Sequence, residues 1–349
     1  MCQFKPATTL NREVTENYRK VRLRVARQVH FSAKRGDTRS IDLVFFVNGL
    51  PVATAELKSS FKQQWQSAVS QYRHDRNPAG QPLLGFGTRA LVHFALDDDQ
   101  VHMTTRLAGE KTYFLPFNRG QDTGAAGNPP TPDGPATSYL WEEVLQRDTW
   151  LGDPGLLMFL KTESSEDPAT GRITRSSTLM FPRYHQWRAV TRLTDAIAAE
   201  GGPGRRYLIE HSAGSGKTNT IAWSAHRLAR LHDAANEKVF DKVLIVSDRR
   251  VLDKQLQEAV AQIDDTVGTV AVIDSTLCDA RAARSPGPGG CPDRVGADRR
   301  RDDPDVPARE ERARDDPGGP ELRGDRRRGP HLAVRQDRHR AEAGSHRGW

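Results

Sequence analysis

The sequence has little cysteine and no long apolar run, and each shortage excludes a class of protein. Its three cysteines are odd in number and lack the spacing of metal ligands, so we expect a reduced compartment rather than a disulfide framework. No apolar run is long enough to span a bilayer, and the N-terminus lacks the apolar core of a signal peptide. The sequence therefore predicts a cytoplasmic protein of two or three domains with no membrane partner.

The C-terminal part lacks most of the residues that build a core. Residues 281–349 contain no Lys, Ile, Phe, Tyr, Met, Asn or Thr, but hold 17 Arg against 13 Asp or Glu, a net of +4. Such a segment cannot bury enough apolar surface to offset the entropy of ordering, so it is predicted to be an Arg-rich disordered tail. A nucleic-acid-binding arm is the alternative, and the interspersed acids argue against it. Of the net charge of +7 on the whole chain, this segment holds +4, which leaves only +3 for the residues before it. The net charge is therefore poor evidence for a nucleic-acid partner.

Two regions with alternating strands and helices precede the tail. The first, residues 1–160, is predicted to hold a hairpin, a polar helix, two further strands and a Gly/Pro-rich loop, at 41–58, 61–76, 90–96, 101–106 and 118–137. The second, residues 161–280, is predicted to hold a helix after Pro182, a strand, a helix and a strand, the last three at 206–210, 217–232 and 242–248. This order is the βαβ pattern of a parallel sheet, so the fold class is α/β.

The hairpin IDLVFFVNGLPVATAELK, residues 41–58, carries Asp42 at one end and Glu56 and Lys58 at the other. Residues two apart on a strand share a face, so Glu56 and Lys58 project together, and Asp42 comes from the neighbouring strand. Two carboxylates and an ammonium on one face suit a hard divalent cation and a water, which is the chemistry of phosphodiester hydrolysis. In this hypothesis Asp42 and Glu56 bind the metal, and Lys58 orients or deprotonates the water. The alternative is an exposed Glu–Lys pair on an ordinary hairpin.

The register of this hairpin bears on the hypothesis. A strict two-residue turn at Asn48-Gly49 would place Asp42 opposite Ala55, on the wrong face of the sheet. One extra residue in the loop or a β-bulge corrects the register, and a proline cannot donate to the ladder. We therefore predict an offset from ideal pairing near Leu50-Pro51.

The stretch YLIEHSAGSGKTNTIAW places Gly-Ser-Gly-Lys-Thr between an apolar strand and a helical run, the context that a phosphate-binding loop requires. Backbone N–H groups of the loop and of the helix N-terminus would bind the phosphates of ATP. Lys217 would reach the β- and γ-phosphates, and the Thr218 hydroxyl would hold Mg²⁺. His211 stands where such loops usually have their first glycine, and a Gly-rich turn without a nucleotide is the alternative. The predicted nucleotide-binding residues of the loop are Gly214, Ser215, Gly216, Lys217 and Thr218.

Two stretches flanking the loop refine this prediction. In RYHQWRAV, upstream, Gln186 is a candidate for reading an adenine edge. In KVLIVSDRRVLDKQLQE, downstream, the predicted strand ends at Arg249 and Arg250, which are candidates for contacts with a nucleic-acid backbone. Each feature alone is also typical of a solvated glutamine or of a surface arginine pair, so their order around the loop carries the prediction.

Several motifs, in this order, resemble the motor and nuclease (R) subunit of Type I restriction enzymes. They cover about residues 1–280 and read NGLPVATAELK, AVSQYRHDR, FLPFNRG, TSYLWEEVLQRD, FPRYHQWRAV, HSAGSGKTNTIAWSAHRL and SDRRVLDKQLQ. The resemblance implies that the residues of a PD-(D/E)xK nuclease are Asp42, Glu56 and Lys58. It also implies that the first RecA-like lobe of a superfamily 2 DNA translocase, here incomplete, contains Gln186, Lys217 and Thr218.

The chain also departs from this family pattern. Members are much longer, with a second motor lobe and a C-terminal docking region, and they have an upstream nuclease glutamate, for which Glu13 and Glu16 are the candidates here. They also carry an Asp-Glu-Ala-His box, which this sequence lacks. In a shifted reading frame, the codons of residues 327–331 permit Asp-Glu-Ala-His, and the next codons permit Thr-Ser-Gln-Ser-Gly-Lys-Thr. We hypothesise a frameshift near residues 278–284, which would make 281–349 a non-native tail.

The resemblance implies ATP-dependent DNA translocation coupled to Mg²⁺-dependent cleavage, the activity of a Type I site-specific deoxyribonuclease. The cofactors would be Mg²⁺ and ATP, and the partners would be double-stranded DNA and the modification and specificity subunits of the complex. For this chain we expect a truncated, motor-deficient part of such an R subunit. Two alternatives stay open: a stand-alone superfamily 2 helicase or ATPase fragment with a structural hairpin, and a non-catalytic remnant that binds DNA or nucleotide weakly.

Overall fold

The computed structural model describes most of the chain up to residue 263. The described residues are 3–6, 9–32, 34–59, 61–121, 124–152, 157–168, 170–200, 204–233, 236–246, 250–263 and 332–335, with the backbone alone for 250–255 and 332–335. Arg249, the position of the hypothesised frameshift and most of the predicted tail therefore lie outside the described residues. The four tail residues that are described do not form a disordered segment but a short strand.

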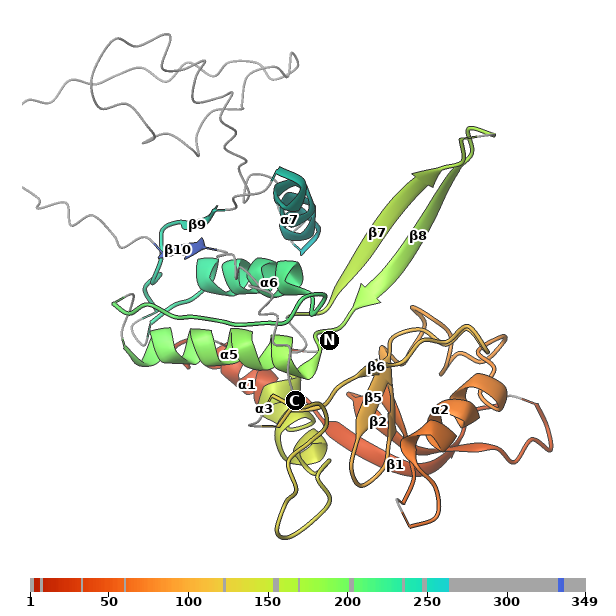
Figure 1. Ribbon diagram of the computed structural model, residues 1–349. Coiled ribbons are helices and arrows are strands. Elements are labelled where there is room, and N and C mark those ends of the chain that lie inside the picture. The colour runs from red at the N-terminus through yellow and green to blue at the C-terminus, as the bar shows by residue number, and fades with distance from the viewer. Residues whose placement is uncertain are drawn as a thin grey trace, which may run out of the picture. The chain divides into compact units, whose positions relative to one another are not determined.

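A six-stranded sheet, the sheet region, occupies residues 23–116 (Figure 1). Its strands lie in sequence order: β1 Leu23–His30, β2 Ser40–Val47, β3 Leu50–Leu57, β4 Val92–Leu96, β5 Val101–Thr104 and β6 Leu115–Pro116. Neighbours are antiparallel except β3 and β4, whose parallel pairing requires the crossover that contains helix α2 Trp65–His74. The predicted hairpin, polar helix and two further strands are thereby confirmed, whereas β1 was not predicted.

The hairpin contains the predicted offset. The register of β2 against β3 shifts between Phe45 and Phe46, where Val52 is the extra residue on β3. Beyond this bulge Leu43 pairs with Ala55, and the same register continued by one residue puts Asp42 opposite Glu56 instead of one position away from it. Residues directly opposite one another in an antiparallel pair share a face of the sheet, so the bulge is what places both carboxylates together.

Apolar clusters lie on both sides of this sheet. Helix α2 contributes Ala68, Val69 and Tyr72 to one cluster, in which Ile41 and Val44 are also fully buried. The other cluster joins the sheet to helices α1 Arg12–Lys20 and α3 Arg147–Trp150, to the short π-helix η1 Leu140–Val144, and to residues of the later helices. The described part of the predicted loop at 118–137 contains no helix or strand, as expected.

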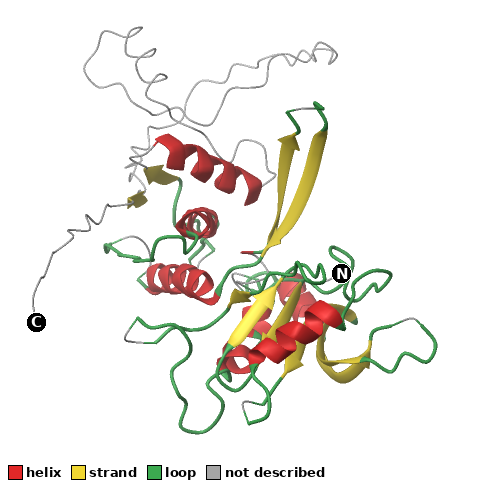
Figure 2. Cartoon of the chain, turned by 45° about the vertical axis from the view of Figure 1, so that its right-hand side comes forward, coloured by secondary structure: helices red, strands yellow, loops and turns green. Residues whose placement is uncertain are grey.

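An unpredicted hairpin follows, built from β7 Phe159–Glu166 and β8 Ile173–Met180. The two strands form a sheet of their own, with continuous pairing from Phe159–Met180 to Glu166–Ile173. Figures 1 and 2 both show it as an extended two-stranded ribbon. Its mostly exposed Ser, Thr and charged side chains lack the alternation of apolar and polar residues that signals a half-buried strand, so the pattern could not reveal it.

The loop–helix region, residues 184–263, contains helices α5 Tyr184–Ala199, α6 Lys217–Ala229 and α7 Arg250–Ile263 (Figure 2). Strand β9 Val243–Val246 pairs in parallel with β10 Leu332–Arg335. The predicted helices after Pro182 and at 217–232, and the strand at 242–248, are confirmed with small changes of boundary.

The predicted strand at 206–210 is wrong. These residues are irregular, and Tyr207, Leu208 and Ile209 are 37%, 90% and 40% exposed. A strand needs a neighbour for its N–H and C=O groups, and in the described part of this region β9 pairs with β10 instead. The apolar run alone therefore did not decide the conformation. Among the described helices, none combines the length and the apolar character needed to cross a membrane.

Candidate functional site

Asp42 and Glu56 meet on one face of the β2–β3 hairpin. Asp42 Oδ2 accepts a hydrogen bond of 2.9 Å from the backbone N–H of Leu57. Its Oδ1 accepts one of 2.9 Å from Nε2 of Gln28, whose Oε1 in turn accepts the hydroxyl of Ser40 at 2.7 Å. Gln28 interrupts β1 with a φ of 51°, a left-handed conformation that is rare for residues other than glycine. Backbone strain of this kind recurs at functional sites, and here it accompanies the aiming of an amide at a carboxylate.

Glu56 is fully buried and is held by an arginine. Nε of Arg76 donates to Glu56 Oε1 at 2.7 Å, and Nη2 of Arg76 donates to the carbonyl of Ser40 at 2.7 Å. Burial raises the pKa of Glu56 to about 7, the charge of Arg76 opposes this rise, and the charge of Asp42 adds to it. Glu56 Oε2 is buried and has no hydrogen-bond partner among the described groups.

Lys58 lies two residues after Glu56, and α2 holds it in place. Lys58 Nζ donates to Gln71 Oε1 at 2.7 Å. The hydroxyl of Tyr72, the next residue of α2, lies 2.7 Å from that of Thr54, which precedes Glu56 by two residues on the same strand. Three residues at alternate positions, Thr54 and Glu56 in β3 and Lys58 just after it, are therefore each held by a side chain from α2 or from the two residues that follow α2. No hydrogen bond or ion pair among the described residues joins Lys58 to either carboxylate.

These supporting side chains were missed by the sequence reasoning. Gln71, Tyr72 and Arg76 all lie in the stretch AVSQYRHDR, where the one available signal was a set of polar residues on a helix that follows a strand. The hydroxyl of Thr54 has a second partner in the buried ring of His93, whose Nδ1 lies 2.8 Å from it. Burial lowers the pKa of His93 to about 3, so this imidazole is neutral at physiological pH.

The donor set suits Mg²⁺ better than a metal that needs many protein ligands. No cluster of three or more His, Cys, Asp or Glu side chains that could hold a metal occurs among the described residues. Mg²⁺ keeps several waters and takes one or two carboxylates, and the orphaned Oε2 of Glu56 beside Asp42 offers that arrangement.

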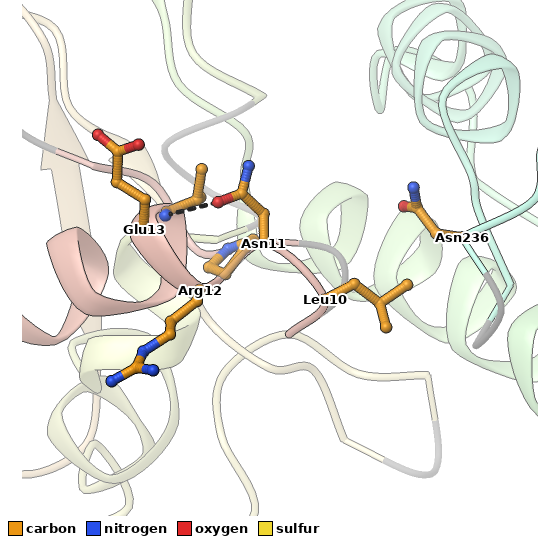
Figure 3. Close-up of a pocket in the computed structure, with 7 residues that line it drawn as sticks. Leu10, Asn11, Arg12, Glu13 and Asn236 are labelled. Carbon is orange, nitrogen blue, oxygen red and sulfur yellow. Dashed lines mark hydrogen bonds between the residues drawn. The ribbon is translucent and has the colours of Figure 1, made fainter.

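The two glutamates proposed as the upstream nuclease residue lie on α1. Glu16 pairs with Arg12 at 2.9 Å. Glu13 stands at the rim of a hollow whose labelled residues also include Leu10 and Asn236 (Figure 3). In the described part of the chain, no hydrogen bond or ion pair joins either glutamate to Asp42, Glu56 or Lys58, and the hollow in Figure 3 contains none of these three.

The glycine-rich loop contains two glycines in the left-handed region. Gly214 and Gly216 have φ of 73° and 84°, and α6 begins directly after them at Lys217, with Thr218 next. A Cβ on Gly216 would lie 2.5 Å from Nε2 of Gln186, so this glycine also permits the close approach of a side chain. Left-handed glycines before a helix N-terminus turn successive N–H groups toward one point, where an anion can bind.

Three side chains from the start of α5 bind the carbonyl groups of this loop. Gln186 Nε2 donates to the carbonyl of Gly216 at 3.0 Å and lies 3.3 Å from that of Ser215, while its Oε1 accepts the backbone N–H of Arg183 at 2.9 Å. The Arg183 guanidinium also donates to the Ser215 carbonyl, as does His185 Nε2 at 3.1 Å. The amide of Gln186 is therefore hydrogen-bonded to the backbone of this chain. The sequence had instead suggested this residue as a candidate for reading an adenine edge.

Two histidines and two cations, Lys217 and Arg183, lie near the loop. The rings of His185 and His211 lie 5.0 Å apart, edge to face. Burial lowers the pKa of His211, and the nearby His185, Lys217 and Arg183 lower it further. Burial also lowers the pKa of His185. The lowered pKa values favour neutral histidines, so the positive charge near the loop comes from Lys217 and Arg183. Of the predicted DNA contacts, Arg249 lies outside the described residues, and Arg250 begins α7 with its side chain undescribed.

Comparisons with known proteins match two segments of the chain. Residues 9–112 match the family "Type I restriction enzyme R protein N terminus", and residues 185–280 match the family "SWI2/SNF2 ATPase". Over 247 residues the chain is 23% identical to the Type I restriction enzyme HindI endonuclease subunit of Haemophilus influenzae, an alignment that covers 69% of this chain and 21% of that protein. The resemblance to the N-terminal region of a Type I restriction R subunit is confirmed. The chain spans about a fifth of the length of this relative.

The two matches fall on the two candidate sites of the R-subunit-like chain. The first includes Asp42, Glu56 and Lys58, and the second includes Gln186 and the glycine-rich loop. The β7–β8 hairpin lies between them, outside both matched segments. A match to an ATPase family fits a superfamily 2 lobe in the second segment.

Proposed function

We propose that this chain is part of a Type I restriction enzyme R subunit, with a PD-(D/E)xK nuclease domain at residues 1–160 and an incomplete first RecA-like lobe at 161–280. The observation that carries the nuclease assignment is the bulge at Val52, which brings Asp42 opposite Glu56 on β3. The whole enzyme of this class would couple ATP-dependent DNA translocation to Mg²⁺-dependent cleavage. Its partners would be duplex DNA and the modification and specificity subunits, with Arg249 and Arg250 contacting the DNA backbone.

In the proposed nuclease site the chain supplies fixed ligands and a proton acceptor. Asp42 and Glu56 would hold Mg²⁺, which when bound polarises a phosphate and acidifies a water. The hydrogen bonds from Leu57 N–H and Gln28 orient Asp42, and Arg76 leaves Oε2 of Glu56 free. Lys58, positioned by Gln71, would orient or deprotonate the attacking water.

Nicking of supercoiled plasmid by the full 349-residue chain tests this assignment. We expect Mg²⁺-dependent nicking that is lost in Glu56→Gln and Lys58→Ala and retained in Lys161→Ala, a control on the exposed β7–β8 hairpin. Absence of nicking by a folded wild-type chain, or equal nicking by all variants, would reject the nuclease assignment for this chain.

For the loop–helix region we propose ATP binding through Gly214, Ser215, Gly216, Lys217 and Thr218, with Gln186 supporting the loop. Thr218 would contribute its hydroxyl to the Mg²⁺ of the bound nucleotide. Lys217→Ala should abolish binding of a fluorescent ATP analogue, whereas Glu56→Gln should bind it like the wild type. Loss of cleavage with ATP binding intact separates this proposal from a stand-alone helicase whose hairpin is structural.

We also propose that residues 281–349 are a non-native tail produced by a frameshift near 278–284. The SWI2/SNF2 match ends at residue 280, next to the proposed shift. Resequencing codons 270–330 tests this directly. A second frame that continues into an Asp-Glu-Ala-His box supports it, and closure of every frame refutes it.

A non-catalytic remnant is the second candidate, and one observation favours it for the loop–helix region. Residues 206–210, before the loop, pair with no strand in the part of the chain that the structure describes, and Leu208 is 90% exposed. A phosphate loop without a paired strand behind it would bind nucleotide weakly. Dissociation constants for ATP well above the millimolar range would favour this reading over an intact ATP site.

A further inference from the structure

Arg183 is a half-buried cation whose described side-chain hydrogen bond goes to a neutral group. Its guanidinium donates to the carbonyl of Ser215, and no ion pair with an acidic side chain is found for it in the described part of the chain. Burial lowers its pKa, which means that the surroundings penalise the charge. Buried charges in folded proteins are normally paired, so a half-buried arginine without an acidic partner among the described residues is a candidate for binding an anion.

The position of this guanidinium identifies where the anion would lie. Arg183 Nη2 is 3.9 Å from the site of a Cβ on Gly216, so it borders the glycine-rich loop itself. The backbone N–H of Arg183 is bound by Gln186, which also binds the Gly216 carbonyl. The arginine is thus fixed to the loop through both its backbone and its side chain.

Among the described neighbours of Arg183, Lys217 adds a positive charge, while the lowered pKa values of His185 and His211 favour their neutral forms. Lys217, His185 and Arg183 each lower the pKa of His211. The rings of His185 and His211 lie 5.0 Å apart, and His185 and Arg183 both donate to the Ser215 carbonyl. Glu210, the acid nearest to the loop in sequence, is exposed. The hydroxyl of Ser215 is buried without a hydrogen-bond partner. An unsatisfied buried hydroxyl among basic groups fits a ligand with several anionic oxygens.

We propose that Arg183 binds the phosphate chain of the nucleotide, in addition to the loop residues. This inference rests on the proposed ATP binding and deepens it. When the nucleotide enters, the guanidinium exchanges the Ser215 carbonyl for phosphate oxygens or bridges the two, because a charge-assisted hydrogen bond to phosphate is the stronger interaction. The half-buried position favours a small polyanion over a DNA backbone, which needs an open surface.

Competition binding on the full-length chain tests the role of Arg183. A fluorescent ATP analogue is displaced in the presence of Mg²⁺ by ATP and, separately, by inorganic tripolyphosphate. The variants are Arg183→Gln, which keeps a donor for the Ser215 carbonyl but loses the charge, and Arg183→Lys, which keeps the charge. Arg192→Gln is the matched control, because it removes one exposed arginine from the same helix.

For Arg183→Gln we expect both competitors to bind about 10- to 100-fold more weakly, as for loss of a hydrogen bond to a charged group. Arg183→Lys should recover part of this loss, and Arg192→Gln should change neither constant by more than about twofold. Equal binding by Arg183→Gln and the wild type, or a loss for ATP without a loss for tripolyphosphate, overturns the inference. If the folded wild type binds neither competitor, the proposed ATP site itself is rejected. If the wild type binds both and Arg183→Gln binds them equally well, only the role of Arg183 is rejected.

Discussion

The sheet region and the loop–helix region hold their candidate sites in different ways. In the sheet region, Asp42, Glu56 and Lys58 are supported by side chains from β1, α2 and the residues after α2, far apart in the sequence. In the loop–helix region, the glycine-rich loop is held by one short segment at the start of α5, while the apolar segment before the loop is exposed. The first site depends on the whole tertiary structure, and the second depends on a loop and two helix ends.

Removal of Arg76 should have the largest effect, because it breaks a buried ion pair in the sheet region. The side chains of Arg76 and Glu56 are 5% and 0% exposed. Arg76→Met leaves a buried carboxylate without its partner, and we expect a loss of about 3–5 kcal/mol in the free energy of unfolding. Urea denaturation followed by circular dichroism measures it.

A matched control for this prediction is the exposed pair of Lys161 and Glu163 on the β7–β8 hairpin, at 2.6 Å. Lys161→Met should leave the unfolding midpoint unchanged within error, because exposed ion pairs contribute little. If Arg76→Met is as mild as this control, the sheet-region site is not held by buried contacts, and the contrast between the two regions disappears.

The stability of the sheet region should also fall with rising pH because of Glu56. Its pKa is about 7 in the folded chain, above the ordinary value of 4.5, so the folded state holds this proton to higher pH than the unfolded state does. The contribution is therefore most favourable below about pH 4.5 and is lost as the pH rises through 7, by on the order of 3 kcal/mol.

Comparison of the wild type with Glu56→Gln isolates this effect, because the buried histidines titrate alike in both proteins. The stability difference between the two, measured by urea denaturation from pH 5 to 8, should move in favour of the variant as the pH rises. A difference independent of pH would show that Glu56 is hydrated in solution and not buried beside Asp42.

Substitutions of Gly214 and Gly216 test how the loop–helix region holds its candidate site. Gly214 and Gly216 share a left-handed φ, but a Cβ on Gly216 meets Gln186, while one on Gly214 meets nothing within 4 Å. Gly216→Ala should therefore weaken ATP binding by about 1–2 kcal/mol more than Gly214→Ala, through displacement of the Gln186 amide. Equilibrium binding of the fluorescent ATP analogue checks this. Plasmid nicking should be the same in both variants, since the loop lies outside the nuclease site.

Much of the sheet region could be predicted from its sequence, because its signals are local. The Asn-Gly turn, the apolar strands and a proline beside the turn were enough to predict the hairpin and its offset, and hence the meeting of Asp42 with Glu56. Gln28 and Arg76 could not be predicted in the same way. Gln28 reaches Asp42 through a left-handed backbone, and Arg76 reaches Glu56 from beyond the end of α2. Such contacts follow from tertiary packing, of which the sequence pattern contains no sign.

The loop–helix region shows the opposite limit of sequence reasoning. The motif Gly-Ser-Gly-Lys-Thr located the loop and the start of α6, but the apolar run before it predicted a strand that the structure does not contain. An apolar sequence shows that a segment favours burial, but the segment forms a strand only where a neighbouring strand is available to pair with it. The sequence correctly singled out Gln186 as a residue near the loop, but its amide donates to the carbonyl of Gly216, a partner that the sequence did not predict.

The smallest effect should come from Leu208, and it tests the contrast most directly. This side chain is 90% exposed in the segment where a buried strand was predicted, whereas Val44 in β2 is 0% exposed. Leu208→Lys should change the free energy of unfolding by less than about 0.5 kcal/mol, as for an ordinary surface substitution. Val44→Lys, the matched control, buries an unpaired charge and should destabilise the fold severely. If thermal denaturation shows comparable losses for the two variants, residues 206–210 are buried in solution. The loop–helix region would then possess the strand that its sequence predicts, and its site would rest on tertiary packing as the sheet region's does.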